Sequence, residues 1–123
     1  MQRFGFFLVP GFSMLSLAAA LEPLRMANAQ AGDELYQWEF LSWNGEPVAA
    51  SNQMVTAPTI GMEQVKELDV LLVVAGINVA SYGDDKLFGW LRQAARQVEL
   101  LGSTSTGALL LAKAKLLRHK TCT

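Results

Sequence analysis

The feature that most constrains the fold of this chain is the unbroken apolar run Val70–Val74, between Asp69 and the Ala75-Gly76 turn. A strand with one face in water alternates apolar and polar residues, whereas this run has no polar member. Such runs are typical of a central parallel strand that is covered on both faces. The run therefore predicts an α/β three-layer sandwich with a mostly parallel sheet.

The rest of the chain alternates in the same sense between strand and helix patterns. Strands are expected at residues 3–9, 36–43, 69–75 and 98–101, with residues 53–57 pairing back on the second strand as a short hairpin partner. Helices are expected from Ser13 or Ser16 to about residue 30, over residues 62–68, from Asp84 or Asp85 onward, and over residues 107–117. Gly32 is placed to end the first helix, whose buried face we predict from Leu17, Leu21, Leu24, Met26 and Ala27.

Composition excludes several classes of function. The 123 residues suffice for one domain, are 51% hydrophobic, and carry a net charge of −1, so no global basic field exists to hold nucleic acid. One Cys and one His exclude an internal disulfide and a His-rich or thiolate metal cluster. We therefore expect no cofactor and no metal, and a cytoplasmic location fits these counts.

The N-terminus has two readings. Arg3 followed by an apolar stretch that ends near Ala18-Ala19-Ala20 has elements of a secretory signal. Pro10-Gly11 interrupts that stretch, however, and the helical pattern continues past it through Glu22 and Arg25. We interpret the segment as a buried strand followed by a helix, and the interruption also argues against a membrane span.

Three turns follow predicted parallel strands, at residues 10–16, 75–78 and 103–107. Ligands of such sheets bind beyond the carboxyl ends of the strands, so these turns predict a pocket. Gly76 permits a close backbone approach, and the amides of Ile77 and Thr106 are candidates for an anion- or carbonyl-binding nest. Each glycine alone has the simpler explanation of turning the chain.

The third turn holds the most suggestive side chain. Ser105 lies where an apolar strand turns through small residues into a helix, the position that carries a nucleophile in many enzymes. A serine hydroxyl needs an adjacent base, and the only histidine, His119, lies about one helix length away along the chain. The sequence therefore indicates an enzyme-like scaffold without the chemistry.

Residues 7–13 and 22–28 resemble the first strand and helix of the class I glutamine amidotransferase-like superfamily, ThiJ/PfpI branch. More narrowly, the chain is similar to the N-terminal domain of AraC-type transcriptional regulators of that branch. Residues 69–76, 105–108 and 111–117 agree, so the resemblance covers essentially the whole sequence in order. It implies a flavodoxin-like, amidotransferase-like sandwich over residues 1–123, incomplete because relatives continue with a further strand, more helices and a helix-turn-helix domain.

Three departures from the resembled family bear on function. Ser105 replaces the catalytic Cys, and Ser16 falls where catalytic members carry an acidic residue, although a shifted register would give that place to Glu22. Lys115 replaces a residue that tends to be Gly, which puts the end of the last helix in question.

These observations predict a non-catalytic ligand-sensing and dimerisation domain of a transcriptional regulator. Its expected ligand is a small polar metabolite over Ser105, Thr106, Gly76, Ile77 and Ser16. Homodimers are expected because so short a version of the fold leaves apolar surface and a strand edge uncovered.

Three rival interpretations stay open. They are a hydrolase or amidase-like enzyme that uses Ser105, a purely structural dimerisation domain, and a DNA-binding module built on Lys113, Lys115, Arg118 and Lys120. Those cations also complement the negative end of a helix, so we expect DNA contacts only through a domain outside this chain.

Overall fold

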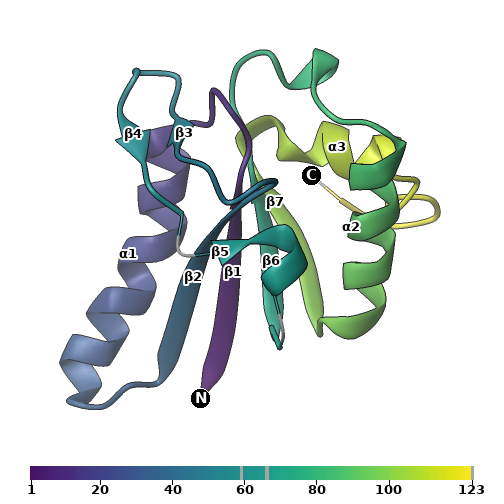
Figure 1. The fold of residues 1–123 in the computed structure, drawn as a ribbon. Coiled ribbons are helices and arrows are strands. Elements are labelled where there is room, and N and C mark those ends of the chain that lie inside the picture. The colour runs from purple at the N-terminus through teal and green to yellow at the C-terminus, as the bar shows by residue number, and fades with distance from the viewer. Residues whose placement is uncertain (59, 66, 123) are drawn as a thin grey trace.

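The computed structural model describes residues 1–58, 60–65 and 67–122, and its elements alternate between strand and helix (Figure 1). The strands are β1 Gln2–Leu8, β2 Tyr36–Ser42, β3 Val48–Ala49, β4 Val55–Thr56, β5 Ile60–Gly61, β6 Val70–Val74 and β7 Leu100–Thr104. The helices are α1 Met14–Ala31, α2 Asp85–Gln97 and α3 Ala108–Lys113, with 3-10 turns η1 Met62–Gln64, η2 Val79–Ser81 and η3 Ser105–Gly107.

The main sheet has the strand order β5-β2-β1-β6-β7, and every pairing within it is parallel. β2, β1 and β6 occupy its interior, and β6, at the place predicted for a central strand, is continuously apolar. β7 pairs with β6 alone among the described strands, so one backbone edge of β7 is open. The parallel sheet and the three-layer architecture confirm the predicted fold class.

Two hydrophobic clusters fill the layers on either side of the sheet. One joins Phe6 and Leu8 of β1 to Leu17 of α1, and it includes Val48 and Ala50 near the small β3–β4 ribbon. The other joins Phe7 and Val9 to the buried faces of α2 and α3. Figure 1 shows α1 on one side of the sheet and α2 and α3 on the other. Neighbouring side chains of β1 therefore point into different cores, as the pleat of a strand requires.

Local capping signals set the bounds of the two long helices. The Ser13 side chain accepts a hydrogen bond from the Ser16 amide at the start of α1, and Gly32 ends that helix with φ 65°. Asp84 caps α2 by accepting from the Leu87 amide. The sequence predicts Gly32 and leaves Ser13 or Ser16 and Asp84 or Asp85 as the caps, and the structure selects Ser13 and Asp84. None of the described helices is both long and apolar enough to cross a bilayer.

Several predicted elements are wrong in detail. The strand within residues 53–57 is β4, which pairs with β3 and not with β2, while β5 takes the place beside the end of β2. Met26 is 55% exposed and is not part of the buried face of α1. In both cases a tertiary contact decides the outcome: a short strand pairs with the nearest free edge, and a helix buries only the face that its neighbours cover.

The predicted helix and strand bounds on the C-terminal side also shift. Only η1 forms within residues 62–68, of which residue 66 lies outside the described residues. The strand expected at 98–101 is β7, two residues further on, because α2 continues to Gln97. The helix expected over 107–117 is the six-residue α3, preceded by η3.

The chain leaves the helical conformation at Lys115, just after α3 ends at Lys113. The φ of Lys115, 63°, lies in the left-handed region, which costs a residue with a Cβ about 1–2 kcal/mol. The glycine that the resembled family tends to have at this position would adopt the left-handed conformation without strain. The sequence departure thus coincides with the point where the chain leaves the helix.

Lys115→Gly is expected to raise the free energy of unfolding by about 0.5–1 kcal/mol, because relief of the left-handed strain exceeds the extra chain entropy of glycine. Urea denaturation followed by circular dichroism measures the change. Lys115→Ala is the control: it removes the same charge but keeps the strain, so its effect should stay within about 0.5 kcal/mol. Equal effects from both variants would contradict this explanation.

Candidate functional site

The turns after β1 and β6 interlock at the carboxyl edge of the sheet. The Ser13 amide donates to the Ala75 carbonyl over 3.1 Å, and the Ile77 amide donates to the Gly11 carbonyl, also over 3.1 Å. Gly76 lies so close to the first turn that a Cβ on it would stand 2.5 Å from the Gly11 carbonyl oxygen. The predicted close approach at Gly76 is confirmed.

The turn after β7 joins the same edge. The Thr106 hydroxyl donates to the Gly76 carbonyl over 2.6 Å. Gly107 packs directly on β6, where a Cβ would meet the Val73 carbonyl oxygen at 2.5 Å. The structure therefore brings the three predicted turns together through backbone contacts that require glycine at two positions.

Ser105 stands at the head of this turn in a strained conformation. Its φ is 52°, in the left-handed region that serine rarely adopts. The strand β7 ends at Thr104 and η3 begins at Ser105, so the chain turns sharply at this residue, as the sequence predicted. Its side chain is exposed, and in the described part of the chain no protein group hydrogen-bonds its hydroxyl. Backbone strain that the surrounding structure maintains at an exposed residue is typical of functional turns.

Ser16 faces this turn from α1. Its hydroxyl lies 3.1 Å from the Thr104 hydroxyl and donates to the Ser13 carbonyl over 3.0 Å. Because Ser16 has one hydroxyl proton, Thr104 is the donor in the pair between them. The place beside the turn is therefore held by two neutral hydroxyls.

Glu22 is the other candidate for the position at which catalytic members of the resembled family carry an acidic residue, and it does not lie beside this turn. It pairs with Arg25 at 2.5 Å on the exposed side of α1, and this pairing raises the pKa of Arg25. Glu22 is about 1.7 helical turns beyond Ser16, so the observed register of α1 assigns the position beside the turn to Ser16.

The predicted amide nest is wrong in one respect. The Ile77 amide already donates to Gly11 and is not available to an anion, and the Ile77 side chain is exposed instead. A six-residue α3 also adds little helix dipole at Thr106. The polar groups that the edge offers are therefore hydroxyls, with Ser105 the one that no protein group occupies.

In the part of the chain that the structure describes, no charged group that could activate Ser105 hydrogen-bonds to it. His119 lies in the exposed segment after α3, outside any described helix. Tyr82 follows η2, and its pKa is raised, first by burial and then by the neighbouring charge of Asp84. Among residues 1–58, 60–65 and 67–122 no cluster of three or more His, Cys, Asp or Glu forms that could hold a metal ion.

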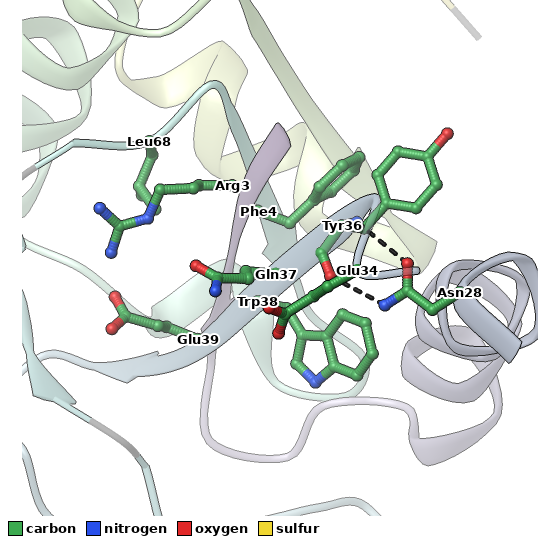
Figure 2. A pocket seen from close by; sticks show the side chains of 9 residues that line it. All are labelled: Arg3, Phe4, Asn28, Glu34, Tyr36, Gln37, Trp38, Glu39 and Leu68. Carbon is green, nitrogen blue, oxygen red and sulfur yellow. Dashed lines mark hydrogen bonds between the residues drawn. The ribbon is translucent and has the colours of Figure 1, made fainter. Parts of the chain in front are cut away.

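Hollows among the described residues lie away from Ser105. One of 280 Å³ lies at the amino ends of β1 and β2 and is lined by Arg3, Phe4, Trp38 and others; Figure 2 shows the side chains that line it. Asn28 at its border accepts from the Leu35 and Tyr36 amides and donates to the Tyr36 carbonyl. This residue fastens α1 to β2. The sequence alone did not predict that role, although an Asn in the last turn before a terminating Gly is a signal that could have indicated it.

The architecture matches known structures over nearly the whole chain. A ThiJ/PfpI family protein from Pseudomonas syringae superposes with a TM-score of 0.76 at 17% identity, over 95% of this chain and 47% of the other. Drosophila melanogaster DJ-1beta gives 0.74 at 20% identity, over 94% and 62%. The protein thus has the DJ-1/ThiJ/PfpI fold, and no family model matches the sequence.

Sequence comparison shows which class of proteins with this fold the chain is similar to. The chain is 42% identical to the HTH-type transcriptional regulator CdhR of Pseudomonas aeruginosa over 122 residues, and 38% identical to its regulator GbdR over 121 residues. A crystal structure of an AraC family regulator from Pseudomonas putida has a TM-score of 0.86 at 29% identity, over 99% of this chain and 65% of that one. The chain matches the N-terminal region of AraC-type transcriptional regulators.

The matched region is a minor part of these relatives. It covers 99% of this chain but 36% of CdhR, and 98% of this chain but 33% of GbdR. The chain therefore spans about a third of the length of the curated regulators that it matches.

Proposed function

We propose that this domain senses a small polar metabolite in a cytoplasmic transcriptional regulator and performs no catalysis. The observation that carries the proposal is Ser105, whose backbone has the strained conformation expected of a nucleophile turn while no described base hydrogen-bonds its hydroxyl. A nucleophile turn that has lost its chemistry keeps an exposed hydroxyl beside other hydroxyls. That arrangement can still bind a ligand.

The ligand class follows from the groups at the edge. Ser105 offers a hydroxyl that can both donate and accept, while the hydroxyls of Thr106 and Ser16 already donate within the protein and can offer only lone pairs. None of these groups carries a charge. An amide or amino-acid-like metabolite with a carbonyl or carboxylate fits such a set. In a regulator, binding there would favour one arrangement of the protein over another only through contacts that differ between the two.

Ser105→Trp is the variant that tests sensing, because it places a bulky side chain on an exposed position over the other hydroxyls. The probes are the free amino acids and their amides, screened by thermal shift. At least one probe should raise the melting temperature of the wild-type domain, and Ser105→Trp should abolish that rise. Ser81→Trp, exposed in η2, is the control. A rise that survives Ser105→Trp would refute this site.

A serine hydrolase or amidase is the second candidate, favoured by the turn geometry at Ser105 alone. A fluorophosphonate probe followed by mass spectrometry distinguishes the two, since labelling requires an activated serine. We expect no labelling of Ser105 above that of Ser105→Ala and no turnover of activated esters. Covalent labelling of Ser105 would favour the hydrolase.

We further propose that the domain forms homodimers and that DNA is bound by a separate helix-turn-helix part of the regulator. The open edge of β7 and the 56% exposure of Leu100 support self-association. The net charge of −1 gives this domain no basic field for DNA. A purely structural dimerisation domain is the outcome if no probe binds.

A further inference from the structure

Two turns of the chain, after β2 and after β3, have the same hydrogen-bonded form. In each turn an exposed Asn is followed by a residue in the left-handed region: Gly45 has φ 78° after Asn44, and Gln53 has φ 73° after Asn52. Oδ1 of each Asn accepts a hydrogen bond from the backbone amide two residues further on, over 3.0 Å in both turns. The two carboxamides are therefore held alike, and the residues that follow them differ.

The hydrogen bond from the Glu46 amide prepares the carboxamide of Asn44 for attack by a nucleophile. Negative charge would gather on Oδ1 if a nucleophile added to Cγ, so a donor at 3.0 Å from Oδ1 favours that addition. The same bond folds the side chain back along the backbone, so that Cγ and the Gly45 nitrogen belong to one closed ring of atoms. Nδ2 of Asn44 hydrogen-bonds to no group in the described part of the protein, so the bond that releases it as ammonia breaks no other contact.

The Gly45 nitrogen is the nucleophile within this ring, and the protein holds it weakly. It donates to the Ser42 carbonyl over 3.4 Å, whereas the Gln53 nitrogen donates to the Ala50 carbonyl over 2.9 Å. Gly45 has no side chain to shield its nitrogen, and both Asn44 and Gly45 are exposed. The longer hydrogen bond and the open approach leave this nitrogen freer to lose its proton and to move toward Cγ.

We infer that Asn44 is a site of spontaneous deamidation, at which the chain modifies itself through a cyclic imide. The Gly45 nitrogen loses its proton to water and bonds to Cγ of Asn44, and the Cγ–Nδ2 bond breaks as ammonia leaves with a proton. Water then adds to either carbonyl of the imide and breaks a C–N bond of the ring, which gives aspartate or isoaspartate. Water is consumed and ammonia is released, so the step needs no oxidant, metal or enzyme.

The products would alter the edge of the sheet at which β2 and β5 end. The turn packs tightly on β5, because a Cβ on Gly61 would stand 3.1 Å from the Gly45 nitrogen. Isoaspartate adds a methylene group to the main chain at this contact, and both products add a negative charge. We therefore expect the chain with isoaspartate at position 44 to be less stable than the original chain.

Ageing of the purified protein in neutral buffer under native conditions tests the assignment. A glutamate-specific protease releases residues 40–63 as one peptide, because the Glu46–Pro47 bond resists cleavage, and this peptide contains both Asn44 and Asn52. Fragment ions assign to each position the mass that replacement of –NH2 by –OH adds. Asn44 should deamidate at least about tenfold faster than Asn52.

Two variants test the role of the residue that follows the asparagine. Gln53→Gly gives Asn52 the same neighbour as Asn44 and removes a left-handed residue with a Cβ, so it should fold, and thermal melts verify this. In that variant Asn52 should deamidate at least about tenfold faster than in the wild type. Asn44→Ser keeps a side-chain oxygen for the Glu46 amide but has no amide to lose, so it should show no mass gain at position 44.

Isoaspartate itself provides a second readout. Protein isoaspartate methyltransferase transfers a methyl group from S-adenosylmethionine to isoaspartate and leaves asparagine unmodified. Labelled methyl groups should accumulate with age on the wild type and stay at the starting level on Asn44→Ser. Aged wild type should also melt at a lower temperature than fresh wild type, while Asn44→Ser should keep its melting temperature.

Three results would overturn the inference. If Asn44 stays intact in the native protein but deamidates in the chain unfolded by urea, the fold protects it. If Asn44 and Asn52 react equally fast, the Gly45 nitrogen confers no selectivity. If Asn52 stays intact in Gln53→Gly, the residue after the asparagine does not select the site. These results do not bear on the ligand test at Ser105 or on dimerisation, so the proposed function stands or falls separately.

Discussion

Gly76→Ala is expected to lower the free energy of unfolding by about 3 kcal/mol, the upper end for overpacking a filled site. The added Cβ would stand 2.5 Å from the Gly11 carbonyl oxygen, 2.8 Å from the Ser13 nitrogen and 3.0 Å from the Phe12 carbonyl carbon. All three are backbone atoms held by the interlocked turns, so no side chain can rotate away. Urea denaturation with fluorescence detection measures the change.

Gly89→Ala is the matched control, because the same methyl group enters open space within α2. The nearest atom to its Cβ would be the Arg92 guanidinium at 3.8 Å. Removing a glycine from a helix interior should stabilise the domain by about 0.5–1 kcal/mol. The two alanine substitutions should therefore act in opposite directions. A loss at Gly76 below about 1 kcal/mol would show that the turns yield easily, and the rigid edge described above would be wrong.

Leu110→Ala is expected to cost about 2–5 kcal/mol, the usual range for emptying a leucine site in a core. Leu110 is fully buried in the cluster on the α2 and α3 face of the sheet, and α3 has only six residues with which to hold the Ser105 turn against β6. The loss combines the apolar area exposed with the cavity left behind. Equilibrium unfolding in urea measures it.

Leu109→Ala, one residue earlier in the same helix, is the control. Leu109 is 40% exposed, so its truncation should cost less than about 1 kcal/mol. A comparable loss for both variants would mean that burial of Leu110 does not decide the stability of α3.

The class of fold could be predicted because its signals are local. The run Val70–Val74 requires cover on both faces whatever its neighbours are. Ser13, Gly32 and Asp84 set helix ends through hydrogen bonds or backbone conformations within one turn. Each signal acts over a few residues, so it can be interpreted without knowledge of the tertiary structure.

The pairing of short strands could not be predicted in the same way. The two-residue strands β3, β4 and β5 have too few residues for an alternating pattern to select a partner. Residues 53–57 were therefore assigned to β2, although β4 pairs with β3. β4 and β3 form a separate two-stranded sheet, a choice of partner that no pattern within so short a strand specifies.

The candidate site, too, could be predicted from the sequence only in part. From the sequence came the sharp turn at Ser105, the small residue at Ser16 and the need for glycine at position 76, because each follows from residue type and position. Only the tertiary structure decided that the hydroxyls of Ser16 and Thr104 lie within hydrogen-bond distance and that the Ile77 amide donates to the Gly11 carbonyl. These outcomes depend on distances of a few ångströms between turns that are far apart in the chain. A hydrogen bond is made or lost over less than one ångström, a precision that residue patterns do not carry.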